Sequence, residues 1–314
     1  MDAIKIIAPG GYSTIQDRGR FEFQNMGVPL SGVLDHFAFD AANILVGNPD
    51  NTPVMELTVM GPSIEIHKRM DIALTGAKMG ITVNTMPVAQ WRSIRVNPGD
   101  MISIGQVQAG CRAYLAVSGG FDVPQVMGSF STYAGANIGG FKGRPIRAKD
   151  VLKTGDAPLL KTERVLPQKD IPIHPTHVTL RAILGPQDDY FDSGIHTLFT
   201  SEYMVTAKAD RMGYRLMGET IPIRDGKPKS IISEPSIPGS IQVPADEQPI
   251  ILLVEQTVGG YAKIATIISS DLGRVAQTTP GDMIRFEKID LETAHSLIYE
   301  EKNKLKRIQK YFIP

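Results

Sequence analysis

The sequence is poor in three features that define whole classes of protein: cysteine, net charge and long hydrophobic runs. Its 314 residues include one cysteine, Cys111, so no intramolecular disulfide can form. The apolar stretch at the N-terminus is too short for a secretory signal, and we therefore expect a reducing, cytoplasmic environment. The longest aliphatic run, at 250–254, is far below the roughly 20 residues that cross a bilayer, so we expect no membrane insertion.

Charge and short motifs argue against further classes. The 33 Lys and Arg residues balance the 33 Asp and Glu residues, so we expect no nucleic-acid partner. The sequence contains neither a P-loop nor a nucleophile elbow, and its six histidines show no metal-ligand spacing, so we predict no metal site. The segment Ala77-Lys78-Met79 matches only part of the Ala-Met-Lys-Met pattern around biotinylated lysines, and we expect no covalent biotin.

What the sequence does contain is a series of short β-like runs separated by 30 glycines and 22 prolines. Apolar and polar residues alternate at 63–67, 179–183 and 283–286, which predicts half-buried strands. The segment Pro-Gly-Asp-Met-Ile occurs at 98–102 and again at 280–284, as if one turn and strand were used twice. We therefore predict a mainly β chain with two β-barrel-type domains.

Helices are few in this prediction. The first covers 34–46, with Asp35 as a possible N-cap and Gly47 as a stop. The last is a C-terminal helix over 291–312, whose apolar residues form one stripe, as expected of a helix that docks on the rest of the protein. A proline-rich, charged stretch around 157–176 predicts a linker. We place an N-terminal β-rich domain at 1–165, the linker at 166–176 and a C-terminal barrel domain with the terminal helix at 177–314.

The first candidate site is a polar loop between glycines that contains Gln16, Asp17, Arg18 and Arg20. Such a loop can present guanidinium and backbone N–H groups to a carboxylate or phosphate. An equally good interpretation is an ion pair between Asp17 and Arg18 or Arg20 that holds a turn or an interface between chains. The sequence alone leaves both interpretations open, the anion-binding loop and the structural ion pair.

The second candidate is the segment 210–216, which is rich in charge. If it is extended, Arg211 and Arg215 share one face with a glycine between them, while Tyr214 lies on the other face. Two arginines on one face suit a planar anion. The alternative is that Asp210 neutralises Arg211 and that Tyr214 packs in the core.

The third candidate joins two segments, 239–244 and 255–263. The apolar strand predicted at 250–254 leads into the polar residues 255–257 and the Gly-Gly turn at 259–260. Such a transition places polar groups at the mouth of a barrel. Gln242 offers a donor and an acceptor, which suits an amide or lactam, and Lys263 offers a point charge for a phosphate or carboxylate. Glu255, Gln256 and Tyr261 complete the predicted site. The alternative is a hairpin with an exposed lysine.

Many ordered blocks spread over nearly the whole chain carry a resemblance to known proteins. They are residues 14–20, 27–32, 35, 42–43, 46–48, 56–58, 61–62, 114–120, 128–129, 210–218, 241–244, 248–250, 259–261 and 280–282. Together these blocks resemble one family, which includes the C subunit of 5-oxoprolinase and allophanate hydrolase subunit 2. Its members are biotin-dependent carboxyltransferase-like proteins and include the antagonist of a sporulation kinase inhibitor.

The resemblance implies a cyclophilin-like barrel and an ATP-dependent 5-oxoprolinase, which converts 5-oxoproline to glutamate. This chain would act with a protein like the B subunit of 5-oxoprolinase to activate the lactam by phosphorylation, and a protein like the A subunit would open the ring. ATP, with Mg, is the implied cofactor, and activity is expected only in the complex. The resulting hypothesis assigns anion binding to Arg211 and Arg215, phosphoryl charge to Lys263, and substrate contacts to Gln242, Tyr214, Glu255, Gln256 and Tyr261.

Two other functions fit the same family. The chain could be a non-catalytic regulatory protein that binds a kinase-inhibitor-like partner, with the loop at 16–20 as the interface. It could also be a carboxyltransferase acting on urea or a related amide, which would require a biotinyl carrier that this chain lacks.

Overall fold

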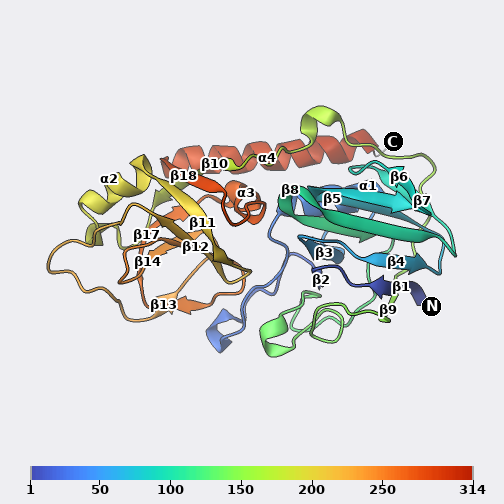
Figure 1. Cartoon of the computed structure of the whole chain (residues 1–314), viewed down its shortest axis with the longest axis horizontal. Coiled ribbons are helices and arrows are strands. Elements are labelled where there is room, and N and C mark those ends of the chain that lie inside the picture. The colour runs from blue at the N-terminus through green and yellow to red at the C-terminus, as the bar shows by residue number, and fades with distance from the viewer. Residues whose placement is uncertain (1, 313–314) are drawn as a thin grey trace. The chain divides into compact units, whose positions relative to one another are not determined.

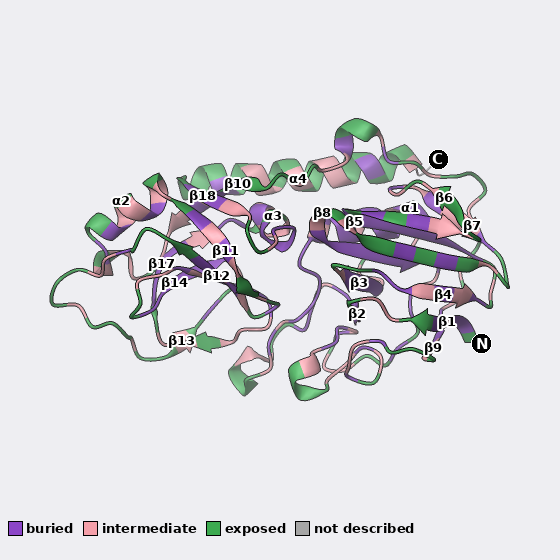
Figure 2. Cartoon of the chain, in the orientation of Figure 1, coloured by how far each residue is buried: buried purple, intermediate pink, exposed green. Residues whose placement is uncertain are grey.

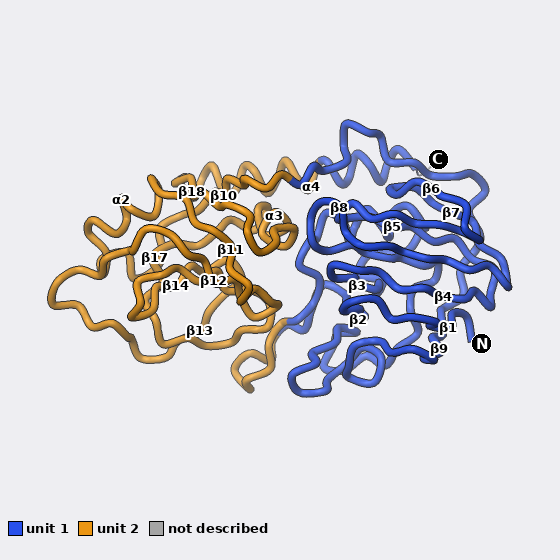
Figure 3. Tube along the Cα trace, viewed as in Figure 1, with its two compact units in different colours: residues 1–21, 31–174, 304–314 blue, residues 22–30, 175–303 orange. Residues whose placement is uncertain are grey.

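A computed structural model describes residues 2–312 and divides the chain into two compact units. Unit 1 comprises residues 1–21, 31–174 and 304–314, and unit 2 comprises residues 22–30 and 175–303 (Figure 3). The main division therefore falls between His174 and Pro175. Neither unit is a single stretch of sequence, because a short early segment groups with unit 2 and the end of the chain groups with unit 1.

Unit 1 contains a nine-stranded sheet that forms a half-barrel (Figure 1). Its central path runs β2-β3-β8-β4-β1-β9, and β5 pairs with β8, β6 and β7. Aliphatic side chains such as Ile4, Leu57 and Leu115 are fully buried in one core cluster. Purple bands mark the buried residues along these strands (Figure 2). The elements are β1 (Asp2–Ala8), β2 (Tyr12–Gln16), α1 (His36–Val46), β3 (Val54–Thr58), β4 (Ser63–Ile66), β5 (Met70–Val83), β6 (Met86–Val88), β7 (Ser93–Val96), β8 (Met101–Val117) and β9 (Val151–Lys153).

Unit 2 contains a closed barrel with the strand order β10-β17-β14-β15-β12-β11-β18 and a separate two-stranded sheet, β13–β16. All barrel pairs are antiparallel except β10 with β18, which is parallel. The elements are β10 (His177–Leu184), α2 (Ser193–Thr200), β11 (Glu202–Ala209), β12 (Gly213–Gly218), β13 (Glu234–Pro235), β14 (Ser240–Val243), β15 (Ile250–Leu252), β16 (Val258–Gly259), β17 (Ala262–Ile267), α3 (Leu272–Ala276), β18 (Met283–Lys288) and α4 (Leu291–Phe312), whose residues from Lys304 on group with unit 1.

The two Pro-Gly-Asp segments make the same turn, once in each unit. Gly99 and Gly281 both have positive φ, at 91° and 97°, a conformation that favours glycine. The carboxylates of Asp100 and Asp282 each accept a hydrogen bond from the backbone N–H three residues earlier, at 2.7 Å. The strands β8 and β18 start directly after these turns, as the sequence predicts.

Both predicted helices are present with the expected ends. Asp35 is the N-cap of α1, since its carboxylate accepts from the Ala38 N–H, and Gly47 ends the helix in the left-handed conformation. The C-terminal helix α4 covers Leu291–Phe312, and the Asp290 carboxylate accepts from the Thr293 N–H at 2.8 Å. Within unit 1, the end of α4 packs its Ile308 side chain into the cluster that α1 builds.

The fold agrees with a mainly β protein with barrel-type sheets, few helices and a C-terminal helix. The short helices α2 and α3 were not predicted. At eight and five residues they are too short to show a helical period clearly. No helix in the described part of the chain is both long and apolar enough to cross a membrane.

Candidate functional site

Two polar side chains meet on neighbouring strands of the unit 2 barrel. In the register of β14 and β17, Gln242 lies directly opposite Lys263. Residues opposite each other in an antiparallel pair point to the same face, so their side chains are neighbours. Both are almost completely buried, at 3% and 2% exposure. The structure therefore brings these two predicted residues together, as neighbours on the same face of the β14–β17 pair.

The buried Lys263 ammonium has a carboxylate partner. Its Nζ lies 2.5 Å from Oε1 of Glu234, which is at the start of β13. The lysine side chain is 3% exposed, whereas the glutamate side chain is 39% exposed. An ammonium that is out of water and unpaired is costly, so Glu234 is what allows a charged lysine at this position. The alternative of an exposed lysine on a hairpin is wrong, because the strand pairing buries it.

Gln187 completes this cluster from the loop that follows β10. Its Nε2 donates to Glu234 Oε1 at 2.7 Å, and its Oε1 accepts from the Lys263 backbone N–H at 3.0 Å. Gly185 permits this approach, because a Cβ there would lie 2.3 Å from the Lys263 carbonyl oxygen. The hydrogen bonds from Lys263 and Gln187 lower the pKa of the Glu234 carboxyl, which therefore stays ionised at neutral pH.

The Gln242 amide is the unusual member of the site. Its Nε2 is buried and has no hydrogen-bond partner among the described residues. A Cβ on Gly259 would lie 2.0 Å from this nitrogen, so only glycine leaves room for the amide there. Gly259 is opposite Glu234 in the β13–β16 pair, which places the amide beside the charged cluster. A buried donor without an acceptor favours a ligand that brings one, such as a carbonyl oxygen.

The positions of Arg211 and Asp210 in the structure differ from those predicted for an extended segment with alternating faces. The strand β12 begins at Gly213, so Arg211 lies in the preceding turn and not on an extended face with Arg215. The Asp210 carboxylate accepts from the backbone N–H groups of Met212 and Gly213, so it stabilises the turn and does not neutralise Arg211. Arg211 instead pairs with Glu255, Nε to Oε1 at 2.6 Å, and is 6% exposed.

The other residues predicted to contact the substrate differ in exposure and in their partners. Arg215 is half-exposed and lies 3.5 Å from an Asp246 carboxylate oxygen, so the two arginines have different acidic partners. Tyr214 is 1% exposed and packs in the barrel, in agreement with the core interpretation, while Tyr261 is 39% exposed. Gln256 donates from Nε2 to the Val258 carbonyl within its own loop. As substrate contacts, these residues stay predictions.

The loop at 16–20 is held by internal hydrogen bonds in unit 1. The Asp17 carboxylate accepts from the hydroxyls of Ser129 and Ser131, and the Arg20 guanidinium donates to the carbonyls of Val126 and Ser131. The buried Gln16 amide bonds to Thr14, Thr132 and Gly32. Arg18 is half-exposed and pairs with Asp40 at 2.6 Å, so the prediction that Asp17 pairs with Arg18 is wrong.

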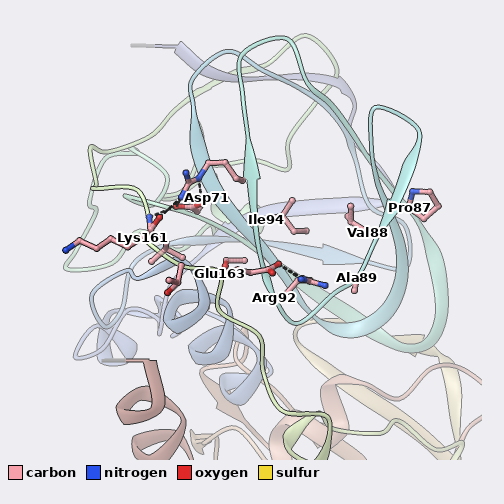
Figure 4. A pocket seen from close by; sticks show the side chains of 12 residues that line it. Asp71, Pro87, Val88, Ala89, Arg92, Ile94, Lys161 and Glu163 are labelled. Atoms are coloured by element: carbon pink, nitrogen blue, oxygen red, sulfur yellow. Dashed lines mark hydrogen bonds and ion pairs between the residues drawn. The ribbon is translucent and has the colours of Figure 1, made fainter. Parts of the chain in front are cut away.

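A pocket of about 560 Å³ in unit 1 does not coincide with any of these residues (Figure 4). It lies between β6, β7 and the segment 160–163. Four of its charged side chains form two ion pairs, Arg92 with Glu163 and Arg95 with Asp71, and Lys161 is the remaining charged residue of the lining. The unit 2 cluster carries the better case for chemistry, because it contains a buried charge and an amide donor without a partner. Among the described residues, no group of three or more His, Cys, Asp or Glu is placed to hold a metal ion.

Sequence reasoning missed two members of the cluster, Gln187 and Glu234. Gln187 follows the predicted strand at 179–183 within a few residues, and polar residues after strand ends are a signal for sites. Glu234 gave no such signal, because β13 has two residues and its pairing with β16 is set by the tertiary structure.

Comparison with known proteins gives consistent matches over nearly the whole chain. The family model for the carboxyltransferase domain, subdomain A and B, matches residues 26–288. The chain is 35% identical to the C subunit of 5-oxoprolinase from Haemophilus influenzae over 300 residues, which is 94% of each chain. It is 37% identical to the C subunit of 5-oxoprolinase from Escherichia coli over 296 residues, 93% of each chain. Among solved structures, the K. lactis urea amidolyase matches with a TM-score of 0.92 at 30% identity, covering 98% of this chain and 20% of that enzyme.

Proposed function

The chain belongs to the carboxyltransferase domain, subdomain A and B, family, and from this we propose that it is the C subunit of a 5-oxoprolinase. Such a complex converts 5-oxoproline to glutamate with ATP. The two 5-oxoprolinase relatives support this, because each aligns over more than nine-tenths of both chains. The observation that carries the proposal is the unpaired Gln242 amide donor beside the buried Lys263 ammonium. A lactam offers the carbonyl oxygen that this donor lacks.

The two residues have different roles in the proposed reaction. Gln242 Nε2 donates to the lactam oxygen and orients it. That oxygen attacks the γ-phosphorus of ATP, the bond from this phosphorus to the bridging oxygen breaks, ADP leaves, and the lactam nitrogen loses its proton to solvent. Lys263 stabilises the negative charge on the transferring group. Phosphoryl transfer depends mainly on positioning and electrostatic stabilisation, so no protein nucleophile is required.

ATP enters this reaction as a substrate, in its complex with Mg. Lys263 and Glu234 are the charged residues of the cluster, and the 39% exposed carboxylate is the one that Mg could reach. The sequence has no P-loop, so we propose that a partner like the B subunit of 5-oxoprolinase contributes the remaining nucleotide contacts. A partner like the A subunit would then open the activated ring.

The predicted arginines take different parts in the proposal. Arg215 is half-exposed and its Asp246 contact is long, at 3.5 Å, so it is the one available for the substrate carboxylate. Arg211 is held by Glu255 and would shape the loop that leads to the Gly-Gly turn. Tyr261, with 39% exposure, is a candidate contact at the rim.

The test is turnover by the complex of this chain with these two partners, measured as 5-oxoproline-dependent release of ADP and glutamate. Lys263→Met should lower kcat by about 10²–10³-fold, the size expected when one charge-stabilising donor is lost. Lys208→Met, on the exposed surface of β11, is the matched control and should leave kcat unchanged. Equal turnover of both variants would sink the proposal.

Carboxyltransfer to urea or a related amide is the second candidate. It is favoured by the match to urea amidolyase, and the Gln242 donor suits an amide oxygen equally well. The chain covers only 20% of that enzyme, so a biotinyl carrier would have to come from another chain. Urea-dependent consumption of carboxybiotin, with no ADP release on 5-oxoproline, would select this function.

A further inference from the structure

Gln187 makes contacts that link the backbone and the charge of the site. Its amide oxygen accepts from the Lys263 N–H at 3.0 Å, and its own backbone N–H donates to the Lys263 carbonyl at 3.3 Å. The loop is therefore tied to β17 on both sides of Lys263. The remaining group, Nε2, is directed to Glu234 at 2.7 Å.

The Glu234 carboxylate is in turn held at one oxygen. Oε1 accepts from both Lys263 Nζ and Gln187 Nε2, at 2.5 and 2.7 Å. The short β13–β16 pair places the Glu234 backbone, but the two-residue strand does not fix a side chain that is 39% exposed. Besides the ammonium itself, the amide of Gln187 is thus the contact that limits the rotation of this carboxylate.

Through these contacts, Gln187 influences the position of the Lys263 ammonium. A buried ammonium stays close to its carboxylate partner, because moving away from it would leave the charge unpaired in the interior. Lys263 is opposite Gln242 across β14 and β17, so the position of the carboxylate also sets how the ammonium and the amide donor are spaced. A displacement of about 1 Å in such a pair can cost about 10²-fold in rate.

We propose that Gln187 and Glu234 are the positioning residues of this site: Gln187 fixes the Glu234 carboxylate, and Glu234 fixes the Lys263 ammonium beside the Gln242 amide. This inference rests on the proposed function only in giving Lys263 and Gln242 the contacts to the reacting groups. Gln187 itself touches no substrate. Its loss should therefore lower kcat while the KM for 5-oxoproline changes little, since the Gln242 contact remains.

The barrel offers a matched control for Gln187. The Gln248 amide makes a similar clamp, accepting from the Gly218 N–H at 2.9 Å and donating to the Gly218 carbonyl at 3.2 Å. Both glutamines are partly buried, but the hydrogen bonds of Gln248 within the described chain go to Gly218 and Asp246 and not to the cluster. Gln187→Met and Gln248→Met each remove one amide clamp and keep the side-chain volume. A general loss of barrel stability would affect both variants, whereas loss of positioning would affect only the first.

The experiment combines two measurements. In the isolated chain labelled with ¹⁵N in its lysine side chains, the hydrogen-bonded Lys263 ammonium should give a resolved Nζ signal, assigned by its disappearance in Lys263→Arg. This signal should shift or broaden in Gln187→Met and stay unchanged in Gln248→Met. In the complex, Gln187→Met should lower kcat about 10- to 100-fold. Gln187→Asn, which keeps the amide but is one methylene shorter, is a second variant should the first fail to fold.

The outcomes separate this inference from the proposed function. An unchanged Nζ signal and an unchanged kcat in a folded Gln187 variant would overturn the positioning role and leave the 5-oxoprolinase assignment standing. A signal that responds to Gln187→Met alone, in a chain whose complex does not turn over 5-oxoproline, would support the positioning role and remove the assignment. An equal response in Gln187→Met and Gln248→Met would overturn the positioning role.

Discussion

The charged pair in the candidate site should respond asymmetrically to the loss of either partner. Glu234→Gln leaves the Lys263 ammonium without its carboxylate, and the lysine side chain is 3% exposed. Lys263→Met leaves the Glu234 carboxylate without its ammonium, but that side chain is 39% exposed and water can solvate it. The two substitutions remove the same ion pair, yet they leave charges in different surroundings.

The expected magnitudes follow from this difference. A buried charge left without its partner costs about 3–5 kcal/mol, and we expect Glu234→Gln to lie near the lower limit, at about 3 kcal/mol. Met is close to Lys in length and needs no partner, so Lys263→Met should cost less than about 1 kcal/mol of unfolding free energy. The double variant should resemble Lys263→Met, because no unpaired ammonium remains.

Urea unfolding of the isolated chain at neutral pH, followed by far-UV circular dichroism, measures these free energies. Trp91 is the single tryptophan and belongs to unit 1, so its fluorescence follows that unit separately. Equal costs for the two single variants, or a larger cost for Lys263→Met, would refute the reasoning. Either result would mean that the ammonium reaches water and that the burial argument for the site is wrong.

Two further predictions concern His36 and Asp40 in unit 1 and the glycine that lies next to the Gln242 amide. Burial lowers the pKa of His36 to about 4 and raises the pKa of Asp40 to about 6. Between pH 4 and 6 the unfolded state binds more protons at the histidine, and the folded state binds more at the aspartate. Relative to the unsubstituted chain, the unfolding free energy of His36→Gln should therefore fall by about 3 kcal/mol as pH rises through this window, and that of Asp40→Asn should rise by about 3 kcal/mol. Urea midpoints across the range check both signs, and profiles parallel to that of the unsubstituted chain would contradict them. Gly259→Ala puts a Cβ 2.0 Å from Gln242 Nε2, so turnover should fall about tenfold or more while the urea midpoint barely moves. Gly260→Ala, whose nearest contact is 3.4 Å, is the control, and normal turnover of Gly259→Ala would show that the amide is no ligand contact.

Features decided by short stretches of sequence could be predicted well. The Asp35 cap, the Gly47 stop and the amphipathic stripe define α1 and α4 because caps and helical periods act within a few residues. The same holds for the two Pro-Gly-Asp turns, where proline, a positive-φ glycine and a side-chain acceptor are adjacent in the chain.

The candidate site was predictable only in part. Gln242 and Lys263 could be selected by chemical type, and the residues between them suggested neighbouring strands. Arg211 was placed wrongly on an extended face, because the Asp210 turn shifts the start of β12 by two residues. A side chain in a turn does not follow the alternation of faces that holds along a strand.

Only the tertiary structure decided what surrounds Lys263. Its carboxylate comes from Glu234, 29 positions earlier, and the amide that holds its backbone comes from Gln187, 76 positions earlier. Contacts at such separations depend on which strands are neighbours in a closed barrel, and no local pattern records that order. The sequence by itself determined the two Pro-Gly-Asp turns, the helices α1 and α4 and the residue types that can carry charge. The closing of the barrel determined which charge is buried, which partner neutralises it and which amide donor is buried without an acceptor among the described residues.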